Sequence, residues 1–589
     1  MRIIFYIIVF FILAGCKDKT NTEATTKTNK RVAKGSKIKY GGTLYLAESE
    51  YNDALFPAEI IDATSMKIAE QIYDGLVRFD AKDLSVLPAI ARDWDIDETQ
   101  TEYTFYLRTN VYFHDDSCFA NGKGRKVTAE DFRYSFETLS QTDFTLNFNA
   151  LFKEKIKGAT AFFNKESDHI EGVQVVNDST LKIILEAPSN SFIYGLAHIS
   201  TSAIAKEAYE MYGKKMKVGT GPFIFKPSEN VEKEINLVYN PNYYLKDDDG
   251  NQLPYLDTVN FTFVPTKIKE LELFRKNKLS VIHGLPASKI ASVISEDIAN
   301  FNQIPPKTIL DRKPEMGLDY YEFNLTRPPF DNKLVRQAFC YAVDKEKIST
   351  KFLKGQGNIA KHYITPKLTT FSGYGYNELE GYTFNPKRAK KLLAEAGYPN
   401  GKNFPYVRLE VNTEGNNRLI ANEITRQLKN VLNVNIELDQ VKLQDKIEHS
   451  KYAKAEMFRS GWVADFPSPE SFLVICYGAN VPKSLDEPSF PNTMRYKNPV
   501  YDSLFHLGSI APTKKESFNY FLQAEKIILE DAPVMPLWYN ADYYLRQSYV
   551  RNFGYNPMEY YDLSEVYIKT LTKEEVIEER KKASHQEGL

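Results

Sequence analysis

The chain has 589 residues, with 77 acidic and 75 basic side chains, a formal net charge of −2 and 43 % hydrophobic residues. This ordinary globular composition excludes a collagenous, coiled-coil or wholly disordered chain. The balanced charge also argues against a nucleic-acid partner, because binding phosphates requires a cationic stripe. At about 150 residues per domain, the length predicts three to four structural units.

The N-terminus has the pattern of a secretory signal. Residues 1–16 read MRIIFYIIVFFILAGC, and Arg2 is their only charged residue. The apolar run from Ile3 to Ala14 is too short to cross a bilayer, which takes about 20 residues. It has the length of the apolar region of a cleaved signal peptide.

The end of this signal resembles a bacterial lipobox. Leu13-Ala14-Gly15-Cys16 carries the resemblance, which implies that Cys16 becomes the lipid-bearing first residue of the mature chain. A plain signal peptide or a buried helix is the alternative. Residues 17–37 have Val32 as their one large apolar residue, so they are predicted to form a flexible tether. The expected location is the cell envelope, on the periplasmic or extracellular face of a membrane.

Beyond residue 40, short runs of alternating apolar and polar residues predict strands. The runs are Thr43–Ala47, Tyr103–Leu107, Leu181–Leu185, Val259–Val264 and Val434–Leu438. Helices are predicted to begin after Thr128 and after Asn385, where capping residues stand before apolar stripes, and a third helix is predicted over Ile420–Leu432. The mixture indicates α/β lobes. The charged tail from Thr572 is expected to fray.

Motifs for metal binding or catalysis are missing from the sequence. Apart from Cys16, the cysteines are Cys118, Cys340 and Cys476, an odd number that predicts no disulfide framework. The eight histidines show no HxxxH or HExxH spacing, so we predict no metal site and no cofactor. Without a GxSxG or similar nucleophile motif, we expect no enzyme activity.

Seven short motifs between Gly41 and Tyr567 follow the order of one family's signatures. They are Ile72–Leu76, Val127–Phe132, Gly219–Phe223, Pro254–Asp257, the block from Phe323 to Ala338, Ala394–Pro399 and Gly461–Phe466. Through them the chain resembles the large bacterial extracellular solute-binding proteins of the oligopeptide/dipeptide/nickel class (family 5). Members of that class are the capture subunits of ABC importers.

The resemblance implies a two-lobed α/β fold of the periplasmic-binding-protein type, type II, in its large three-domain form. The ligand would lie between the lobes. One domain would be discontinuous, built from residues 38–74, 215–315 and 541–589, with a second domain over 75–214 and a third over 316–540. Two strands that cross near residues 315 and 540 would form the hinge.

The resemblance also implies a ligand site around Asp465, which matches an aspartate that takes the α-ammonium of a peptide. A fixed carboxylate would offset the cost of bringing that cation into a closed, water-poor cleft. Alternatively, Asp465 caps a turn before Pro467. Arg459 matches an arginine that faces the same cleft, where it would meet a ligand carboxylate or form an internal salt bridge.

Neighbouring residues would complete the site. Trp462 would form a wall for a ligand side chain or pack in the core, and Gly461 and Val463 would offer backbone groups to an extended peptide. His283 is either a cleft residue or a lone exposed histidine. The remaining predicted ligand-binding residues are Tyr320, Tyr321, Trp538, Tyr539, Asn540 and Ala63.

The predicted function is therefore capture of oligo- or dipeptides and their delivery to the membrane permease and ATPase subunits of an ABC transporter. We expect a monomer held on a membrane surface by its lipid. Two alternatives remain open. The same fold could bind another solute, such as a nickel chelate, haem or an oligosaccharide. The protein could also be a sensor or adhesin that feeds no transporter.

Overall fold

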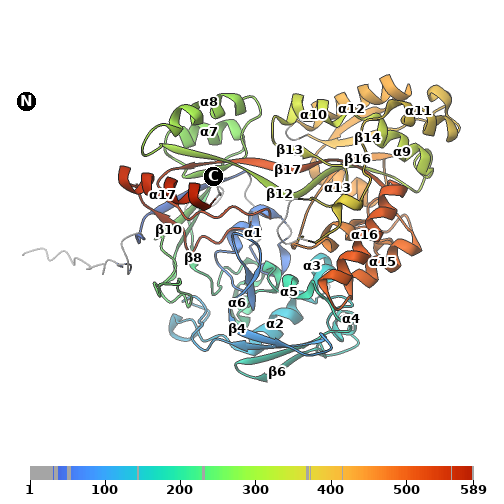
Figure 1. Cartoon of the computed structure of the whole chain (residues 1–589). Coiled ribbons are helices and arrows are strands. Elements are labelled where there is room, and N and C mark those ends of the chain that lie inside the picture. The colour runs from blue at the N-terminus through green and yellow to red at the C-terminus, as the bar shows by residue number, and fades with distance from the viewer. Residues whose placement is uncertain are drawn as a thin grey trace, which may run out of the picture.

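The structure is a computed structural model that describes residues 31, 33, 38–49, 55–60, 62–141, 145–228, 233–366, 371, 373–413, 416–558 and 560–586. The predicted signal, Cys16 and most of the predicted tether lie outside the described residues. Within them, the chain forms the α/β lobes that the sequence predicts (Figure 1).

The first lobe contains two four-stranded sheets around one continuous core. One sheet has the order β1 (Thr43–Glu48), β10 (Thr258–Phe263), β9 (Glu234–Tyr239) and β8 (Phe223–Lys226). The other has the order β4 (Ala91–Ile96), β5 (Glu102–Leu107), β7 (Thr180–Ile184) and β6 (Val173–Asn177). The helices of this lobe include α1 (Ala63–Ala69), α2 (Ala129–Leu139), α3 (Thr145–Leu151), α4 (Ala159–Phe163), α5 (Phe192–Gly195) and α6 (Lys206–Tyr212). Helices α7 (Lys267–Arg275) and α8 (Ile290–Phe301) pack instead with Ile282, Tyr543 and Leu545 in a third, smaller core.

The second lobe is built on part of a larger sheet and has its own core. The sheet has the order β11 (Val281–His283), β17 (Val534–Gln547), β12 (Thr308–Phe323), β16 (Met457–Val463), β14 (Arg408–Asn412) and β15 (Glu437–Val441), with β13 (Gly357–Ile359) also paired to β17. The helices of this part include α9 (Lys333–Ala342), α10 (Lys345–Ile348), α11 (Pro386–Glu395), α12 (Asn417–Leu432), α13 (Leu443–Lys451), α14 (Glu470–Leu473), α15 (Pro499–Ser509) and α16 (Lys514–Asp531).

Two long antiparallel strands, β12 and β17, run through both lobes (Figure 1). They pair from Thr308 opposite Gln547 to Glu322 opposite Val534. Residues 315 and 540, where the sequence predicts the crossing, lie inside them. The register shifts near Pro314, and such irregularities bend a strand locally. We call β12 and β17 the two crossing strands.

The helix starts follow the predicted capping chemistry. The Thr128 backbone N–H donates to Asp131 Oδ2 at 2.8 Å, which closes a capping box at the start of α2. The Asn385 side chain accepts from the Arg388 N–H at 3.0 Å at the start of α11. The apolar stripe of α2 then buries Phe132 and Phe136 completely.

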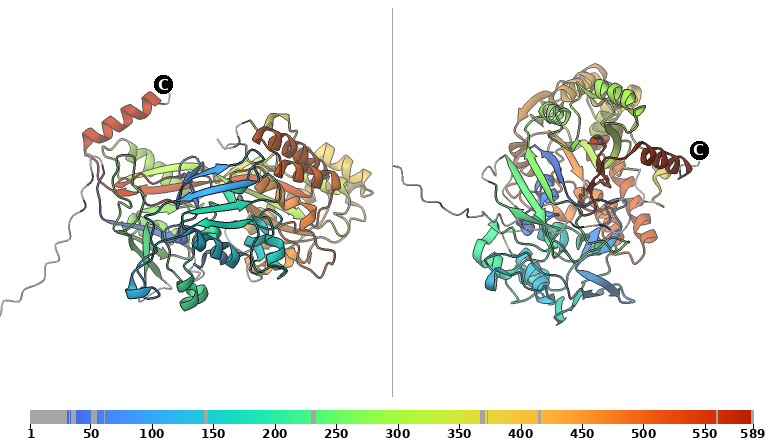
Figure 2. Two further views of the ribbon diagram at one scale, coloured as in Figure 1. Left: turned by 90° about the horizontal axis from the view of Figure 1, so that it is seen from below. Right: turned by 90° about the vertical axis from the view of Figure 1, so that its left-hand side faces the viewer.

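Two predicted elements differ from the structure. The strand predicted from Val434 begins instead at Glu437, because Asn433 ends α12 in a left-handed conformation and Val434 packs into the core before pairing with β14 starts. The charged tail forms helix α17 (Lys573–Gln586) rather than fraying. Thr572 and Glu575 exchange capping hydrogen bonds there. Figure 2 shows α17 standing away from the body.

The chain is already fixed at Arg31, inside the segment predicted to be a tether. The Arg31 guanidinium donates to the Pro254 carbonyl and to Asp257 Oδ1, each at 2.7 Å, and lies 4.0 Å from the ring centre of Tyr239. These contacts attach residue 31 to the first lobe. No helix in the described part of the chain is long and apolar enough to cross a membrane.

Candidate functional site

Strand β16 leaves one backbone edge without a neighbouring strand. On one side, β16 pairs with β12 along its whole length, from Met457 opposite Phe323 to Val463 opposite Gly317. On the other side, β14 pairs only with Met457 and Phe458. From residue 459 onward, no strand in the described part of the chain pairs with the second edge of β16, which we call its free edge.

The alternation of the backbone shows which residues face this free edge. The Ala464 N–H donates to the Met316 carbonyl of β12, whereas the Arg459 carbonyl accepts from Lys446 Nζ at 3.0 Å. Because neighbouring residues point to opposite sides, Gly461 and Val463 share the direction of Arg459. Gly461 and Val463 are also exposed, Val463 by 54 %. The two residues predicted to offer backbone groups thus line the free edge.

Asp465 follows this edge on a turn that is held in place. Its N–H donates to Ser471 Oγ at 2.8 Å, and the Trp462 indole donates to the Ser471 carbonyl at 2.6 Å. The Asp465 side chain is exposed, and among the described residues its carboxylate has no hydrogen-bond or ion-pair partner. Of the two alternatives for Asp465, the capping bond is therefore not formed by its side chain.

The pKa of Asp465 is raised to about 6, because the surrounding protein removes part of the water that would stabilise its charge. The nearby charge of Lys155 lowers the pKa and offsets part of this effect. The Asp465 side chain is thus exposed at the surface and yet surrounded by nearby protein. A cation that binds beside Asp465 would stabilise this poorly solvated negative charge.

Lys155 belongs to the first lobe and reaches the second. Its Nζ lies 3.9 Å from Oε1 of Glu470, which begins α14 beside the Asp465 turn. Asn190 of the first lobe also donates to the Ala511 carbonyl of the second. The lobes are thus in contact close to Asp465, and the group that influences its pKa comes from the opposite lobe.

Arg459 forms the internal salt bridge that was one of its two predicted roles. Its Nη2 contacts Asp319 Oδ1 on β12, and the Arg459 side chain is 23 % exposed. The Arg459 Nε is buried without a hydrogen-bond partner in the described structure. One donor of the guanidinium is therefore engaged, and contact with a ligand carboxylate stays a prediction.

Four of the predicted aromatic residues are buried in the second lobe. Tyr320 and Tyr321 lie in a stretch of β12 that is buried on both faces, and burial raises the pKa of both phenols. Trp538 and Tyr539 of β17 are at most 7 % exposed, and the Tyr539 hydroxyl donates to the His362 carbonyl at 3.0 Å. In this conformation these rings build the core beneath the site. Trp462 is half-buried, beside Phe490.

For Asn540 and Ala63, contact with a ligand stays a prediction. Asn540 lies on β17, and its Oδ1 is buried without a hydrogen-bond partner in the described residues. Its amide packs so closely over Gly317 that a Cβ there would lie 2.5 Å from Asn540 Nδ2. Ala63 is exposed at the first position of α1, which the Asp62 side chain caps.

His283 is neither lone nor fully exposed. Its Nε2 lies 2.9 Å from Glu315 Oε1 and 3.7 Å from Asp542 Oδ2, and the ring stacks on Tyr544. The sequence did not indicate Glu315 or Asp542, because these residues lie on different strands far from His283 along the chain. Only the pairing of β11 with β17 and of β17 with β12 brings the three together.

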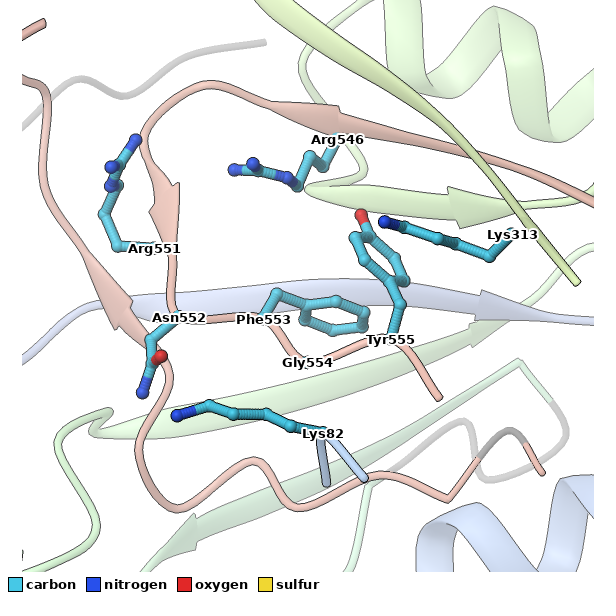
Figure 3. A pocket seen from close by; sticks show the side chains of 8 residues that line it. All are labelled: Lys82, Lys313, Arg546, Arg551, Asn552, Phe553, Gly554 and Tyr555. Atoms are coloured by element: carbon cyan, nitrogen blue, oxygen red, sulfur yellow. The ribbon is translucent and has the colours of Figure 1, made fainter. Parts of the chain in front are cut away.

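A separate basic hollow of about 310 Å³ contains none of the predicted ligand-binding residues (Figure 3). It is lined by Lys82, Lys313, Arg546, Arg551, Asn552, Phe553, Gly554 and Tyr555. Acidic residues offset part of its charge, since Arg551 Nη2 lies 2.5 Å from Glu579 and Arg546 Nε lies 3.8 Å from Asp311. The site around β16 and Asp465 is therefore distinct from this hollow.

Two α/β lobes joined by two crossing strands define a type II periplasmic-binding-protein fold. The model of the family described as bacterial extracellular solute-binding proteins, family 5 (middle), matches residues 85–483. The chain belongs to this family of solute-binding proteins.

Known proteins resemble the chain over nearly its whole length. The dipeptide-binding protein DppE of Bacillus subtilis is 25 % identical over 571 residues, which cover 94 % of this chain and 96 % of DppE. Heme-binding protein A of Haemophilus influenzae is 26 % identical over 564 residues, 93 % of this chain and 95 % of its own. The structure of the periplasmic binding protein DppA from Helicobacter pylori with the peptide STSA has a TM-score of 0.75 and 23 % identity, covering 90 % of this chain and 99 % of DppA.

Proposed function

We propose that the protein captures peptides with a free N-terminus between its lobes. The observation that carries this proposal is the free edge of β16, which leads to Asp465, a carboxylate with no hydrogen-bond or ion-pair partner among the residues that the structure describes. The backbone groups of Gly461 and Val463 can bond an extended peptide whatever its side chains. Asp465 can then pair with the α-ammonium through charge-assisted hydrogen bonds. The resemblance to DppE and to DppA bound to STSA supports the same ligand class.

The proposal extends to delivery. We infer that the closed, loaded form docks on the permease of an ABC importer, whose ATPase drives uptake, and that binding involves no chemical change in the peptide. Membership of the solute-binding family supports this role. Lipid attachment at Cys16 would keep a monomeric protein at the membrane surface, and it rests on the lipobox resemblance alone.

The test compares a free tripeptide with its N-acetylated form by isothermal titration calorimetry on the full chain, in the native protein and in Asp465→Asn. The free peptide should bind the native protein at least about thirtyfold more tightly than the acetylated one, because an unpaired buried charge costs about 2 kcal/mol or more. Asp465→Asn should remove most of this preference. Lys153→Gln, a change at an exposed position, serves as the control.

Two results would contradict the peptide proposal. Equal affinity for the free and acetylated peptides would show that Asp465 does not bind the α-ammonium group. Native mass spectrometry of the purified protein that found a haem or a sugar in place of peptides would favour another solute within the same family.

A further inference from the structure

Three metal-binding side chains converge where strands β11, β12 and β17 meet. They are His283, Glu315 and Asp542, which we call the His–Glu–Asp trio. One donor atom from each lies within 4.8 Å of the donor atoms of the other two. We propose that this trio binds a divalent d-block metal ion such as Zn²⁺ or Ni²⁺. This site goes beyond the proposed peptide binding and does not depend on it.

The spacing of the donors suits a single ion. Zinc lies about 2.0–2.2 Å from imidazole nitrogen and carboxylate oxygen, so two donors on a tetrahedral ion stand about 3.3 Å apart. The distances from His283 Nε2 to Glu315 Oε1 and to Asp542 Oδ2 are 2.9 and 3.7 Å, on either side of that value. Small side-chain rotations would equalise them.

The trio is also held in position by neighbouring groups. The His283 ring stacks on Tyr544 at 4.4 Å between ring centres, with the planes 7° apart. Asp542 Oδ1 accepts from Gln356 Nε2 at 3.1 Å and from the Tyr543 N–H at 2.7 Å, which turns Oδ2 toward His283. Supporting bonds of this kind orient the ligands of metal sites.

Gly284 packs closely against the trio. A Cβ at this position would lie 3.2 Å from Asp542 Oδ2, and the φ of Gly284 is +78°, which disfavours any side chain. Two lysines lie nearby. Lys267 Nζ bonds the His283 carbonyl at 2.7 Å and pairs with Glu270 at 3.0 Å, and Lys313 stands opposite Asp542 in the pairing of β12 with β17. Glu270 offsets part of the charge of Lys267.

The donor set narrows the choice of ion and predicts an open position. One imidazole with two carboxylates suits Zn²⁺, Ni²⁺ and related ions better than Cu(I), which prefers sulfur. Three protein ligands leave at least one coordination position for water or for a donor atom of a bound solute. Glu315 stands two residues before Gly317, which pairs with Val463, so the trio and the free edge of β16 belong to one sheet.

The test titrates the chelator-stripped full chain with Zn²⁺ or Ni²⁺ alone, by calorimetry, and records the visible spectrum with Co²⁺. The native protein should bind one equivalent and show Co²⁺ ligand-field bands. Glu315→Gln, Asp542→Asn and His283→Asn should each weaken binding at least about tenfold, since even outer-sphere partners contribute that much. Thermal unfolding in chelator checks that each variant folds.

A matched control is available at His169, whose Nδ1 also lies 2.9 Å from a glutamate, Glu137, but whose other neighbour is Arg133 at 3.1 Å. His169→Asn should leave metal binding unchanged. The proposal is overturned if the native chain binds no stoichiometric metal, or if the trio variants bind it as tightly as His169→Asn does. Either result would show that His283 only forms ion pairs with Glu315 and Asp542 and that the three residues bind no metal. If one trio variant fails to fold, the other two and the Co²⁺ spectrum decide.

Discussion

The carboxylate of Asp465 is accessible to water yet poorly solvated, and this poor solvation raises its pKa to about 6. A bound α-ammonium favours the ionised form and lowers the pKa of Asp465, so between the lowered pKa and about 6 binding releases a proton. Peptide affinity should therefore fall by up to about tenfold per pH unit as the pH drops below 6. Peptide α-amino groups lose their charge near pH 7.7–8.0, at which affinity should fall again. Calorimetry between pH 4.5 and 9 should show a maximum between these limits.

The same residue links pH to stability with a definite sign. Its folded-state pKa of about 6 lies above the ordinary value of 3.8, so the folded chain holds the proton more tightly. The stability contributed by Asp465 is fully present below pH 3.8 and is lost as the pH rises through about 6. The melting temperature of Asp465→Asn at pH 8 should thus be no lower than that of the native protein. The fall in peptide affinity below pH 6, which we call the acid limb, should disappear in this variant. A lower melting temperature at pH 8 would argue against this account.

At the scale of the element, the two edges of strand β16 have different roles: one pairs with β12, and the other is the proposed peptide-binding edge. The Val463 N–H points to the free edge, so proline there removes a donor to the ligand without breaking the pairing with β12. Val463→Pro should weaken peptide binding about fivefold, which corresponds to one hydrogen bond of about 1 kcal/mol. Val463→Ala keeps the N–H and is the matched control. Equal affinities in the two variants would show that the free edge does not bond the peptide.

Elements that depend on neighbours in the sequence could be predicted from it. The capping residues at Thr128 and Asn385 define their helices through bonds that span three residues. The helix α17 was missed, although Thr572 and Glu575 form a local cap, because the high charge of the tail outweighed this signal. Local chemistry thus determined most boundaries.

What depends on strand pairing could not be predicted. Tyr320 and Tyr321 stand before a family signature, but β12 is a central strand buried on both faces from Met316 onward, so alternation leaves neither residue exposed. The His–Glu–Asp trio needs three strands in register before its donors meet. Asp465, by contrast, was found through its motif, and its surroundings are known only from the fold.

At the scale of the whole molecule, the two lobes share control of the site through Lys155. Its charge lowers the pKa of Asp465, and the residue comes from the opposite lobe. Lys155→Gln should therefore raise that pKa and move the acid limb of peptide binding to higher pH. Lys153→Gln, two residues away and exposed, should leave the profile unchanged. Identical pH profiles for the two variants would mean that the lobes are apart when peptide binds.

The attachment of Arg31 to the first lobe has a mechanical consequence. If lipid is carried at Cys16, 15 peptide units lie between that residue and Arg31, which is attached to the fold. Fully extended, such a length spans about 50 Å at about 3.3–3.6 Å per residue. The protein would then stay within about 50 Å of the bilayer, and it would release its ligand there rather than carry it across the envelope.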